Sequence, residues 1–295
     1  GTVTVATGSH DHGQGHWTTF AQVLATQLGI PFEKIRLMQT DSDQLRMGTG
    51  TGGSKSLMCS GTAIVEASEK VIEKGKLIAS HVLEAAVSDI AFEQGRFAIA
   101  GTDRSITILD LAQKLRSGLA LPADVPNTLD VDHTSSAKPA TYPNGCHICE
   151  VEVDPATGTV QLAAYSSVND VGRVVNPMIV RGQLDGGAVQ GLGQALCESL
   201  VYDRETGQPV TGSLMDYAVP HADIMPRFFV TSMDESTPCK NNVLGVKGVG
   251  ELGTIGATPA VVNAVADALA RHGVPPVDMP ATPLRLFEAI RAAGK

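Results

Sequence analysis

The sequence predicts an α+β or mixed α/β fold, and three observations support this prediction. Short alternating stretches, such as residues 2–6 (TVTVA), indicate strands, and longer runs with helical apolar spacing stand between them. Strands and helices follow one another without a strict βαβ period, and no internal repeat is visible. The chain has 295 residues, of which 43% are hydrophobic and 18% charged. That is enough core for one large domain or two smaller ones.

The first half of the chain is predicted to open as β-α-β. The first helix ends at Gly29, with Pro31 just after it, which is a common way for a helix to stop. A polar, glycine-rich loop over 40–56 then leads into a long helix. In order, the predicted elements are a strand over 2–6, a helix over 16–29, a strand over 33–39, a helix over 56–86, a hairpin over 89–99 turning at Gln94 and Gly95, and a helix over 108–116.

The second half follows residues 118–143, a stretch rich in Pro, Asp, Ser and Thr that is the best candidate for an internal boundary. A hairpin over 146–170 has PATG as its turn. Thr258 and Pro259 form an N-cap and N1 pair, so a helix is predicted to begin there. The predicted helices of this half span 176–196, 259–270 and 283–292.

Charge and hydropathy exclude two classes of partner. The formal net charge is −9 and no Lys/Arg run occurs, which argues against nucleic acid. No uninterrupted apolar run approaches the ~20 residues that cross a bilayer, so no membrane span is expected. No signal peptide is visible, and we expect a cytoplasmic location, with the periplasm as the alternative. Because Gly1 opens a strand already under way, we expect a processed subunit or a piece of a longer polypeptide.

Four loops carry the chemistry that the sequence suggests. Each lies next to a helix start or inside a helical run. Helix N-termini expose unpaired N–H groups, which suits a phosphate-bearing ligand. The four are GSHDHGQGH (8–16), GTGTGGSKS (48–56), GQLDGGAVQGLGQ (182–194) and GVKGVGELGTIGA (245–257).

Simpler motif interpretations fit poorly. GTGTGG satisfies GxGxxG but does not directly follow a strand, and a serine separates Lys55 from the glycine that a P-loop needs beside it. A nicotinamide dehydrogenase is therefore a weak alternative. His10, His12 and His16 lack the HExxH spacing of a zinc hydrolase. Cys146 and Cys149 form one CxxC pair on an alternating, strand-like segment, and a metal site usually needs a second pair.

Taken together, the four loops resemble the xanthine oxidase / aldehyde oxidoreductase / carbon monoxide dehydrogenase family of molybdenum hydroxylases. The chain resembles the C-terminal molybdopterin-binding domain of their large subunit, in the same order from Gly1 to about Glu288. The resemblance implies that residues 1–295 form this domain. It also implies an α+β fold of two subdomains, with mixed sheets packed against helices.

The resemblance also implies roles for individual residues. Glu251 is expected to be the general base at molybdenum, and Gln14 to hydrogen-bond an oxo ligand of the metal. No protein side chain is expected to ligate the metal, which the pterin dithiolene holds. Lys55 stands where many members carry arginine, so it keeps the charge but loses the bidentate fork. The expected cofactor-binding residues are Gln14, Gly15, Gly52, Gly53, Ser54, Lys55, Ser56, Gln190, Lys247, Gly248 and Val249.

The implied enzyme is larger than this chain. Its cofactor is a molybdopterin in mononucleotide or cytosine dinucleotide form, and its partners are the remaining large-subunit domain, an iron–sulfur subunit with [2Fe–2S] clusters, and an FAD-containing or other electron-transfer subunit. Five scattered cysteines cannot bind those clusters. GVKGVGELGTIGA looks most like the aldehyde-oxidising or carbon monoxide dehydrogenase branch. A xanthine or N-heterocycle dehydrogenase is the alternative within the family, and a non-catalytic assembly domain that binds no cofactor alone is the alternative from another class.

Overall fold

A computed structural model describes all residues except 40, 46, 49, 137–139 and 295. Parts of the predicted loop over 40–56 and of the stretch 118–143 fall on these positions and lie outside the described residues. The chain forms two compact units. The first unit comprises Gly1–Thr141 with Cys239–Val246, and the second comprises Tyr142–Pro238 with Lys247–Lys295. The mixture of helices and several sheets confirms the predicted α+β class.

The first unit opens with the predicted β-α-β arrangement. Strands β1 (Val3–Thr7) and β2 (Ile35–Gln39) pair in parallel, and helix α1 (His16–Leu28) connects them. α1 ends at Leu28 and is capped by Gly29, whose φ of 59° is the left-handed conformation that glycine adopts without strain. Because the strands are parallel, their carboxyl ends lie at one edge, and the loops leaving both strands start there.

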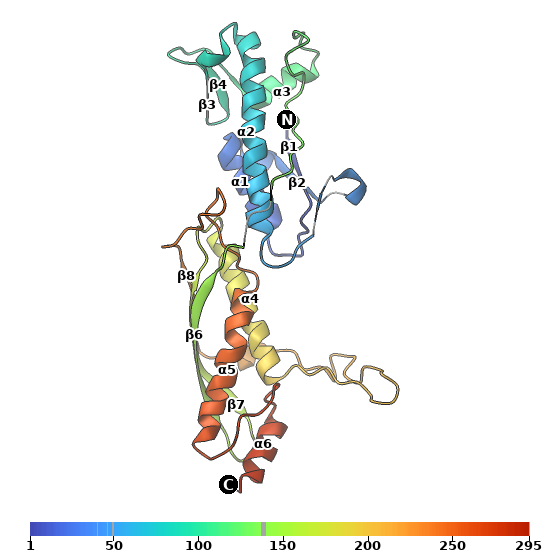
Figure 1. Ribbon diagram of the computed structural model, residues 1–295, viewed down its shortest axis with the longest axis vertical. Coiled ribbons are helices and arrows are strands. Elements are labelled where there is room, and N and C mark those ends of the chain that lie inside the picture. The colour runs from blue at the N-terminus through green and yellow to red at the C-terminus, as the bar shows by residue number, and fades with distance from the viewer. Residues whose placement is uncertain (40, 46, 49, 137–139, 295) are drawn as a thin grey trace. The chain divides into compact units, whose positions relative to one another are not determined.

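Helix α2 (Ser56–Leu83) packs beside α1 and carries a small antiparallel sheet at its far end (Figure 1). The sheet has the order β3-β4-β5, and Phe97 of β4 fills the space above Gly75 of α2. β5 was not predicted, because three residues carry too little pattern to read. The remaining elements of this unit are β3 (Ile90–Glu93), β4 (Arg96–Ile99), β5 (Ser105–Thr107), α3 (Ile108–Arg116), and the 3-10 helices η1 (Phe32–Lys34), η2 (Ser42–Gln44) and η3 (Val87–Asp89).

The second unit is a three-stranded sheet with helices on one face (Figure 1). The predicted hairpin is confirmed as β6 (Asn144–Val153) and β7 (Val160–Asp170), and β8 (Phe228–Asp234) pairs in parallel with β7. The sequence reasoning missed β8. The unit is completed by α4 (Pro177–Leu196), α5 (Leu252–Ala270), α6 (Pro283–Ala292) and the 3-10 helix η4 (Ala222–Ile224).

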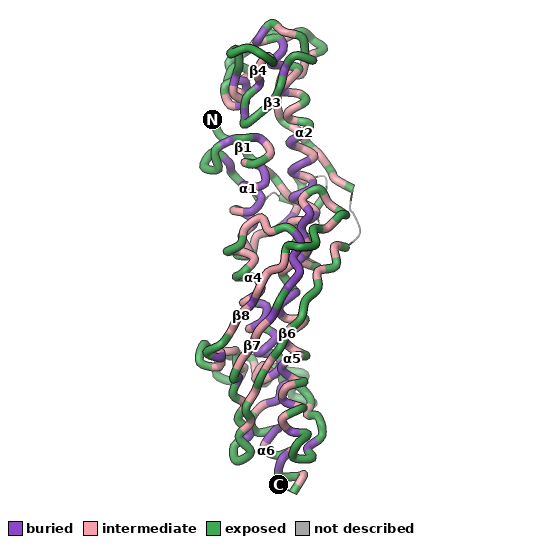
Figure 2. Tube along the Cα trace, turned by 90° about the vertical axis from the view of Figure 1, so that its left-hand side faces the viewer, coloured by how far each residue is buried: buried purple, intermediate pink, exposed green. Residues whose placement is uncertain are grey.

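The core of this unit lies between the sheet and helices α4 and α5, where Figure 2 shows buried residues along both helices and along β7. Leu162 of β7, Leu192 of α4 and Val261 of α5 belong to one cluster of buried side chains. Among the described residues, α5 is the one helix long and apolar enough to cross a membrane. One face of α5 is buried, where it packs on α4 and β6.

The predicted start of the last long helix is wrong. α5 begins at Leu252, and Pro259 lies inside it. Proline favours the first helical position because it lacks the N–H that an interior position uses. Here tertiary packing overrides this local preference, since Gly253 lies against the backbone of α4 and Ala257 is fully buried. The hydroxyl of Thr258 donates to the Thr254 carbonyl oxygen at 3.1 Å, which supplies a hydrogen bond next to the proline.

Candidate functional site

Two of the four glycine-rich loops meet in the first unit, at the carboxyl edge of β1 and β2. The loop after β1 leads into α1, and the loop after β2 leads into α2. Thr51 joins them: its hydroxyl donates to the His10 carbonyl oxygen at 2.6 Å and accepts from the His10 N–H at 3.1 Å. The Gly50 N–H donates to the Gly8 carbonyl oxygen at 3.0 Å. The sequence reasoning singled out both loops but missed Thr51, because nothing local identifies its partner.

Gln14 lies in this assembly with its amide held by its own loop. Its Oε1 accepts from the His12 N–H at 2.5 Å, and its Nε2 donates to the His10 carbonyl oxygen at 2.8 Å. Nε2 also lies 3.4 Å from Nε2 of His16, which is buried and stacked on Phe20. The structure therefore brings Gln14 and the loop 50–56 together through the backbone of His10.

Asp11 holds the loop before α1 in place, a role that the sequence reasoning missed. Its carboxylate accepts hydrogen bonds from the N–H groups of Gly13 at 2.7 Å and Trp17 at 3.0 Å. Burial raises the pKa of Asp11, but the bonds from Trp17 and Gly13 outweigh it and hold the pKa below its usual value. Asp11 thereby caps α1, whose N-cap residue Gly15 has no side chain to do so.

The N-terminus of α2 has the features of an anion-binding site. Its N-cap residue, Lys55, makes no side-chain cap bond, and its first turn contains no acidic residue. A Cβ built on Gly52 or Gly53 would meet nothing within 4 Å, so the loop before the helix is open. The exposed N–H groups of a long helix, its dipole and a lysine together favour a phosphate group. On these observations, the residues predicted here fit a phosphorylated cofactor.

Glu251 lies in the second unit, as the N-cap residue of α5. Its side chain is exposed and makes no cap bond to the helix, while its carbonyl oxygen accepts from the Ile255 N–H at 3.1 Å. The helix behind it is fixed by backbone contact, because a Cβ on Gly187 of α4 would lie 3.1 Å from Cα of Gly253. Glu251 is therefore an exposed residue at the start of a tightly packed helix.

Gln190 lies further along the same pair of helices. Gly187 contacts Gly253 and Gly191 contacts Ala257, so α4 and α5 run in the same direction. This register puts the exposed Gln190 more than one helical turn beyond the level of Glu251.

Lys247 and Val249 anchor the segment that carries Glu251, and Gly248 between them is buried. The Lys247 ammonium lies 2.5 Å from Oδ2 of Asp170, and the two side chains are only 8% and 11% exposed. Burial raises the pKa of Asp170, but Lys247 and the Gly172 N–H hold it below its usual value. Val249 packs against the cluster of Val171, Leu184 and Leu252. The Lys247 ammonium is thus engaged at the end of β7, a role the sequence reasoning missed because Asp170 is remote in sequence.

The predicted site residues divide between the two units. Gln14, Gly15 and residues 52–56 belong to the first, whereas Gln190, residues 247–249 and Glu251 belong to the second. The expectation that Glu251 and Gln14 act at the same metal stays a prediction. In the described part of the chain, no three His, Cys, Asp or Glu side chains form a group that could hold a metal ion. Cys146 and Cys149 lie on β6, as expected for a strand, and burial raises the pKa of the Cys149 thiol to about 11.

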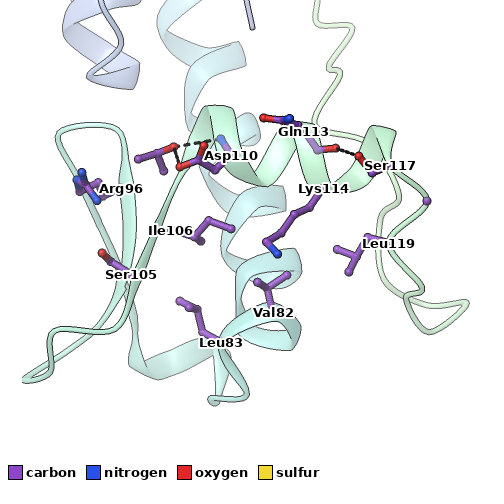
Figure 3. Close-up of a pocket in the computed structure, with 12 residues that line it drawn as sticks. Val82, Leu83, Arg96, Ser105, Ile106, Asp110, Gln113, Lys114, Ser117 and Leu119 are labelled. Carbon is purple, nitrogen blue, oxygen red and sulfur yellow. Dashed lines mark hydrogen bonds between the residues drawn. The ribbon is translucent and has the colours of Figure 1, made fainter.

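Two cavities lie in the first unit, away from most of the predicted residues. One, of about 740 Å³, lies between the end of α2, the strands β4 and β5, and α3. Figure 3 shows the Lys114 side chain extending from α3 toward Val82, with Arg96 to one side and Leu83 below. No predicted site residue lines it. The other, of about 1190 Å³, lies along β1, α2 and residues 127–136, and Lys55 is the single predicted residue in its lining.

Comparison with known proteins gives consistent matches. The family model described as "Molybdopterin cofactor-binding domain" matches residues 1–226. The chain is 38% identical over 293 residues to the nicotine 6-hydroxylase large subunit of Paenarthrobacter nicotinovorans, covering 99% of this chain and 36% of that protein. It superimposes on quinoline 2-oxidoreductase from Pseudomonas putida 86 with a TM-score of 0.85 and 36% identity, covering 99% of this chain and 37% of that one.

A second solved structure also superimposes over the chain. CO dehydrogenase from Oligotropha carboxidovorans gives a TM-score of 0.88 at 32% identity, covering all of this chain and 36% of that one. The chain therefore spans little more than a third of the length of the relatives it matches.

Proposed function

Because this chain belongs to the molybdopterin cofactor-binding domain family, we propose that it is the catalytic part of a molybdenum hydroxylase large subunit that contributes the general base. The observation that carries this proposal is the position of Glu251, an exposed residue at the start of a helix fixed by backbone contact. A general base must lie within ~3 Å of the proton that it takes, and a rigid support holds such a geometry. A solvated turn residue would need no such support.

The residues present fit the cofactor that the family implies. Gly52, Gly53 and Ser54 with the N-terminus of α2 would receive the phosphate end, and Lys55 would add a positive charge. Gln14 would lie at the metal end, with its amide oriented by the backbone of His10 and His12. When bound, the molybdenum cofactor supplies the redox chemistry that oxidises a substrate carbon with oxygen derived from water.

The chain's own contribution is proton transfer and orientation. Glu251 would accept a proton from the attacking oxygen, which is the step a positioned carboxylate accelerates. The anchored pair of Lys247 and Asp170 holds the backbone four residues before it. Asp11 and Thr51 hold the loop that carries Gln14.

The complete enzyme would need further protein. We propose that the rest of the large subunit, an iron–sulfur subunit with [2Fe–2S] clusters and an FAD-containing or other electron-transfer subunit complete it. The relatives are longer than this chain, and one is named as a subunit of a 6-hydroxypseudooxynicotine dehydrogenase complex. The rival is an assembly domain without cofactor. Metal analysis of protein co-expressed with its partners discriminates: about one molybdenum per chain supports the enzyme, and none supports the rival.

The substrate class has two candidates. We favour an aldehyde or CO, since the segment around Glu251 resembles that branch and the CO dehydrogenase superimposes over the full chain. Hydroxylation of an N-heterocycle is the second candidate, favoured by the similarity to nicotine 6-hydroxylase and quinoline 2-oxidoreductase. The purified complex should be assayed with an aromatic aldehyde, CO, xanthine, nicotinate and quinoline. Turnover of N-heterocycles alone would refute the first candidate.

The decisive variant is Glu251→Gln in the assembled enzyme. The amide keeps the size of the side chain but cannot take up the proton, so turnover should fall by about 10² or more while molybdenum content stays unchanged. Glu205→Gln, at an exposed position outside the predicted site, is the matched control. Near-normal turnover of Glu251→Gln would remove Glu251 from the mechanism.

A further inference from the structure

A chain of polar side chains, formed by two buried residues and a half-buried histidine, lies beneath the first turns of α5. His147 of β6 faces Tyr165 and Asn169 of β7, with 2.6 Å between its Nδ1 and the tyrosine hydroxyl and 3.2 Å between its Nε2 and Oδ1 of Asn169. Tyr165 and Asn169 are fully buried. The proposed function gives none of the three a role. Polar groups are costly to bury, so a complete network in a core requires an explanation.

The hydrogen bonds of this network assign its protons. Nδ2 of Asn169 donates to the Ser167 hydroxyl at 2.9 Å and to the Ser232 carbonyl oxygen at 3.1 Å, which leaves Oδ1 as the acceptor facing His147. His147 must therefore donate from Nε2. A neutral imidazole has one N–H, so its Nδ1 accepts from the Tyr165 hydroxyl. Burial lowers the pKa of His147 and raises that of Tyr165, which agrees with both rings being neutral.

The imidazole also touches the backbone of α5. A Cβ built on Gly256 would lie 2.5 Å from Cδ2 and Cε1 of His147, closer than real Cβ atoms approach. Glycine is therefore needed at 256 so that the helix can lie on the ring. Tyr165 packs with Ala257 of α5 and Ala188 of α4 in one buried cluster. Both rings support α5 within two turns of Glu251.

The start of α5 is consequently held from two sides by rigid groups. On one side Gly253 meets the α4 backbone, and on the other Gly256 meets an imidazole. An apolar side chain in place of His147 could change rotamer, whereas a ring bonded at both nitrogens keeps its orientation. A small displacement of the helix start would move the carboxylate at its end by a similar distance.

We propose that His147 and Tyr165 are positioning residues that fix the first two turns of α5 and thereby the carboxylate of Glu251. This inference rests on the proposed function, which gives Glu251 its role as base. Misplacing a catalytic group by about 1 Å can lower the rate about 10²-fold, so the position of the start of α5 affects turnover.

Two variants of the complete enzyme with its partner subunits test the proposal. Tyr165→Phe removes the hydroxyl donor from Nδ1 of His147, and Gly256→Ala forces the helix away from the ring. Each should lower kcat by about 10- to 100-fold, while KM and molybdenum content stay within about twofold. Hydrogen exchange should accelerate in residues 252–258. Gly212→Ala is the control, because this exposed glycine lies outside the four loops and a Cβ there would make only an ordinary contact, 3.5 Å from the Pro209 carbonyl oxygen.

A double variant separates positioning from general damage to the fold. If Tyr165 acts through Glu251, adding Tyr165→Phe to Glu251→Gln should lower kcat no further. The inference would be overturned if the losses of kcat from Tyr165→Phe and Glu251→Gln were additive. It would also be overturned if Tyr165→Phe and Gly256→Ala left both kcat and hydrogen exchange unchanged. If Tyr165→Phe does not fold, the same test is made with Gly256→Ala, alone and combined with Glu251→Gln. Near-normal turnover of Glu251→Gln itself would instead overturn the proposed function.

Discussion

At the scale of single residues, the pair formed by Lys247 and Asp170 shows how burial changes what a charge does. The sequence suggests a lysine that faces a cofactor, but the structure directs its ammonium to a carboxylate at the end of β7. Asn144 and the Gly172 N–H also donate to Asp170, so the carboxylate has several partners. A buried ion pair whose hydrogen bonds are all made can be tolerated inside a protein. Removing one of the two residues leaves the other as an uncompensated buried charge, which destabilises the fold.

Lys247→Met should therefore destabilise the fold at pH 7 by about 3 kcal/mol, the lower end of the range for breaking a buried pair. The variant should be compared with wild type by guanidinium unfolding. Lys240→Met removes an exposed lysine and should change the unfolding free energy by less than about 0.5 kcal/mol.

The effect of Lys247→Met should also depend on pH. In the wild type the folded pKa of Asp170 is lowered, so the pair's stabilisation is complete above the pKa of an unfolded aspartate. It is lost as pH falls through the lowered folded pKa. In the variant Asp170 can instead take up a proton, and a neutral acid costs less to bury. The difference between variant and wild type should shrink between pH 7 and pH 4, and a constant difference would contradict this account.

At the scale of elements, the contact between α4 and α5 determines where Glu251 lies. Gly187 and Gly191 on α4 and Gly253 on α5 let the two helices approach each other closely. Gly256 on α5 lets that helix lie on the His147 ring. Glycine is costly inside a helix, by about 1 kcal/mol relative to alanine, so close packing must offset it. Local reasoning about proline placed the start of α5 too late, because this packing is invisible in a single segment.

Gly253→Ala tests the helix contact. Its Cβ would lie 2.6 Å from the Ala188 nitrogen and from the Leu184 carbonyl oxygen, which are backbone atoms and cannot rotate away. We expect a loss of about 1–3 kcal/mol of unfolding free energy, typical of overpacking. Gly182→Ala, with open space around its Cβ, should be neutral or stabilise by up to about 1 kcal/mol. If Gly253→Ala and Gly182→Ala changed the thermal unfolding equally, the contact between Gly253 and α4 would not be tight.

At the scale of the whole molecule, each unit carries a histidine that is held neutral. Burial is the largest cause that lowers the pKa of His16 in the first unit and of His147 in the second. Carboxylates with lowered pKa values, Asp11 and Asp170, also occur in both units. All four groups bind protons more readily in the unfolded chain, so a fall in pH destabilises both units.

Stability should accordingly fall in two stages as pH decreases. Above about 6.5 the unfolded histidines are neutral and the full stability is present; below it they take up protons that the folded state resists. The carboxylates contribute a second loss as pH falls below about 4. Melting temperatures at pH 7.5, 5.5 and 3.5 check this. In His147→Gln the first stage should be smaller, and a first stage unchanged by that variant would exclude His147 as a contributor.

The sequence alone determined what depends on neighbours along the chain. Alternation and helical spacing predicted β1, α1, β2, α2 and the β6–β7 hairpin, and the four loops in their order pointed to the family that the comparisons then matched. Tertiary structure decided what depends on partners distant in sequence. The pairing of β8, the early start of α5, the partner of Lys247 and the bonds between His147, Tyr165 and Asn169 all join residues that no local pattern relates. Local preferences are worth about 1 kcal/mol per residue or less, and about 3 kcal/mol for a proline inside a helix, whereas packing and burial act on many residues at once and prevail where the two disagree.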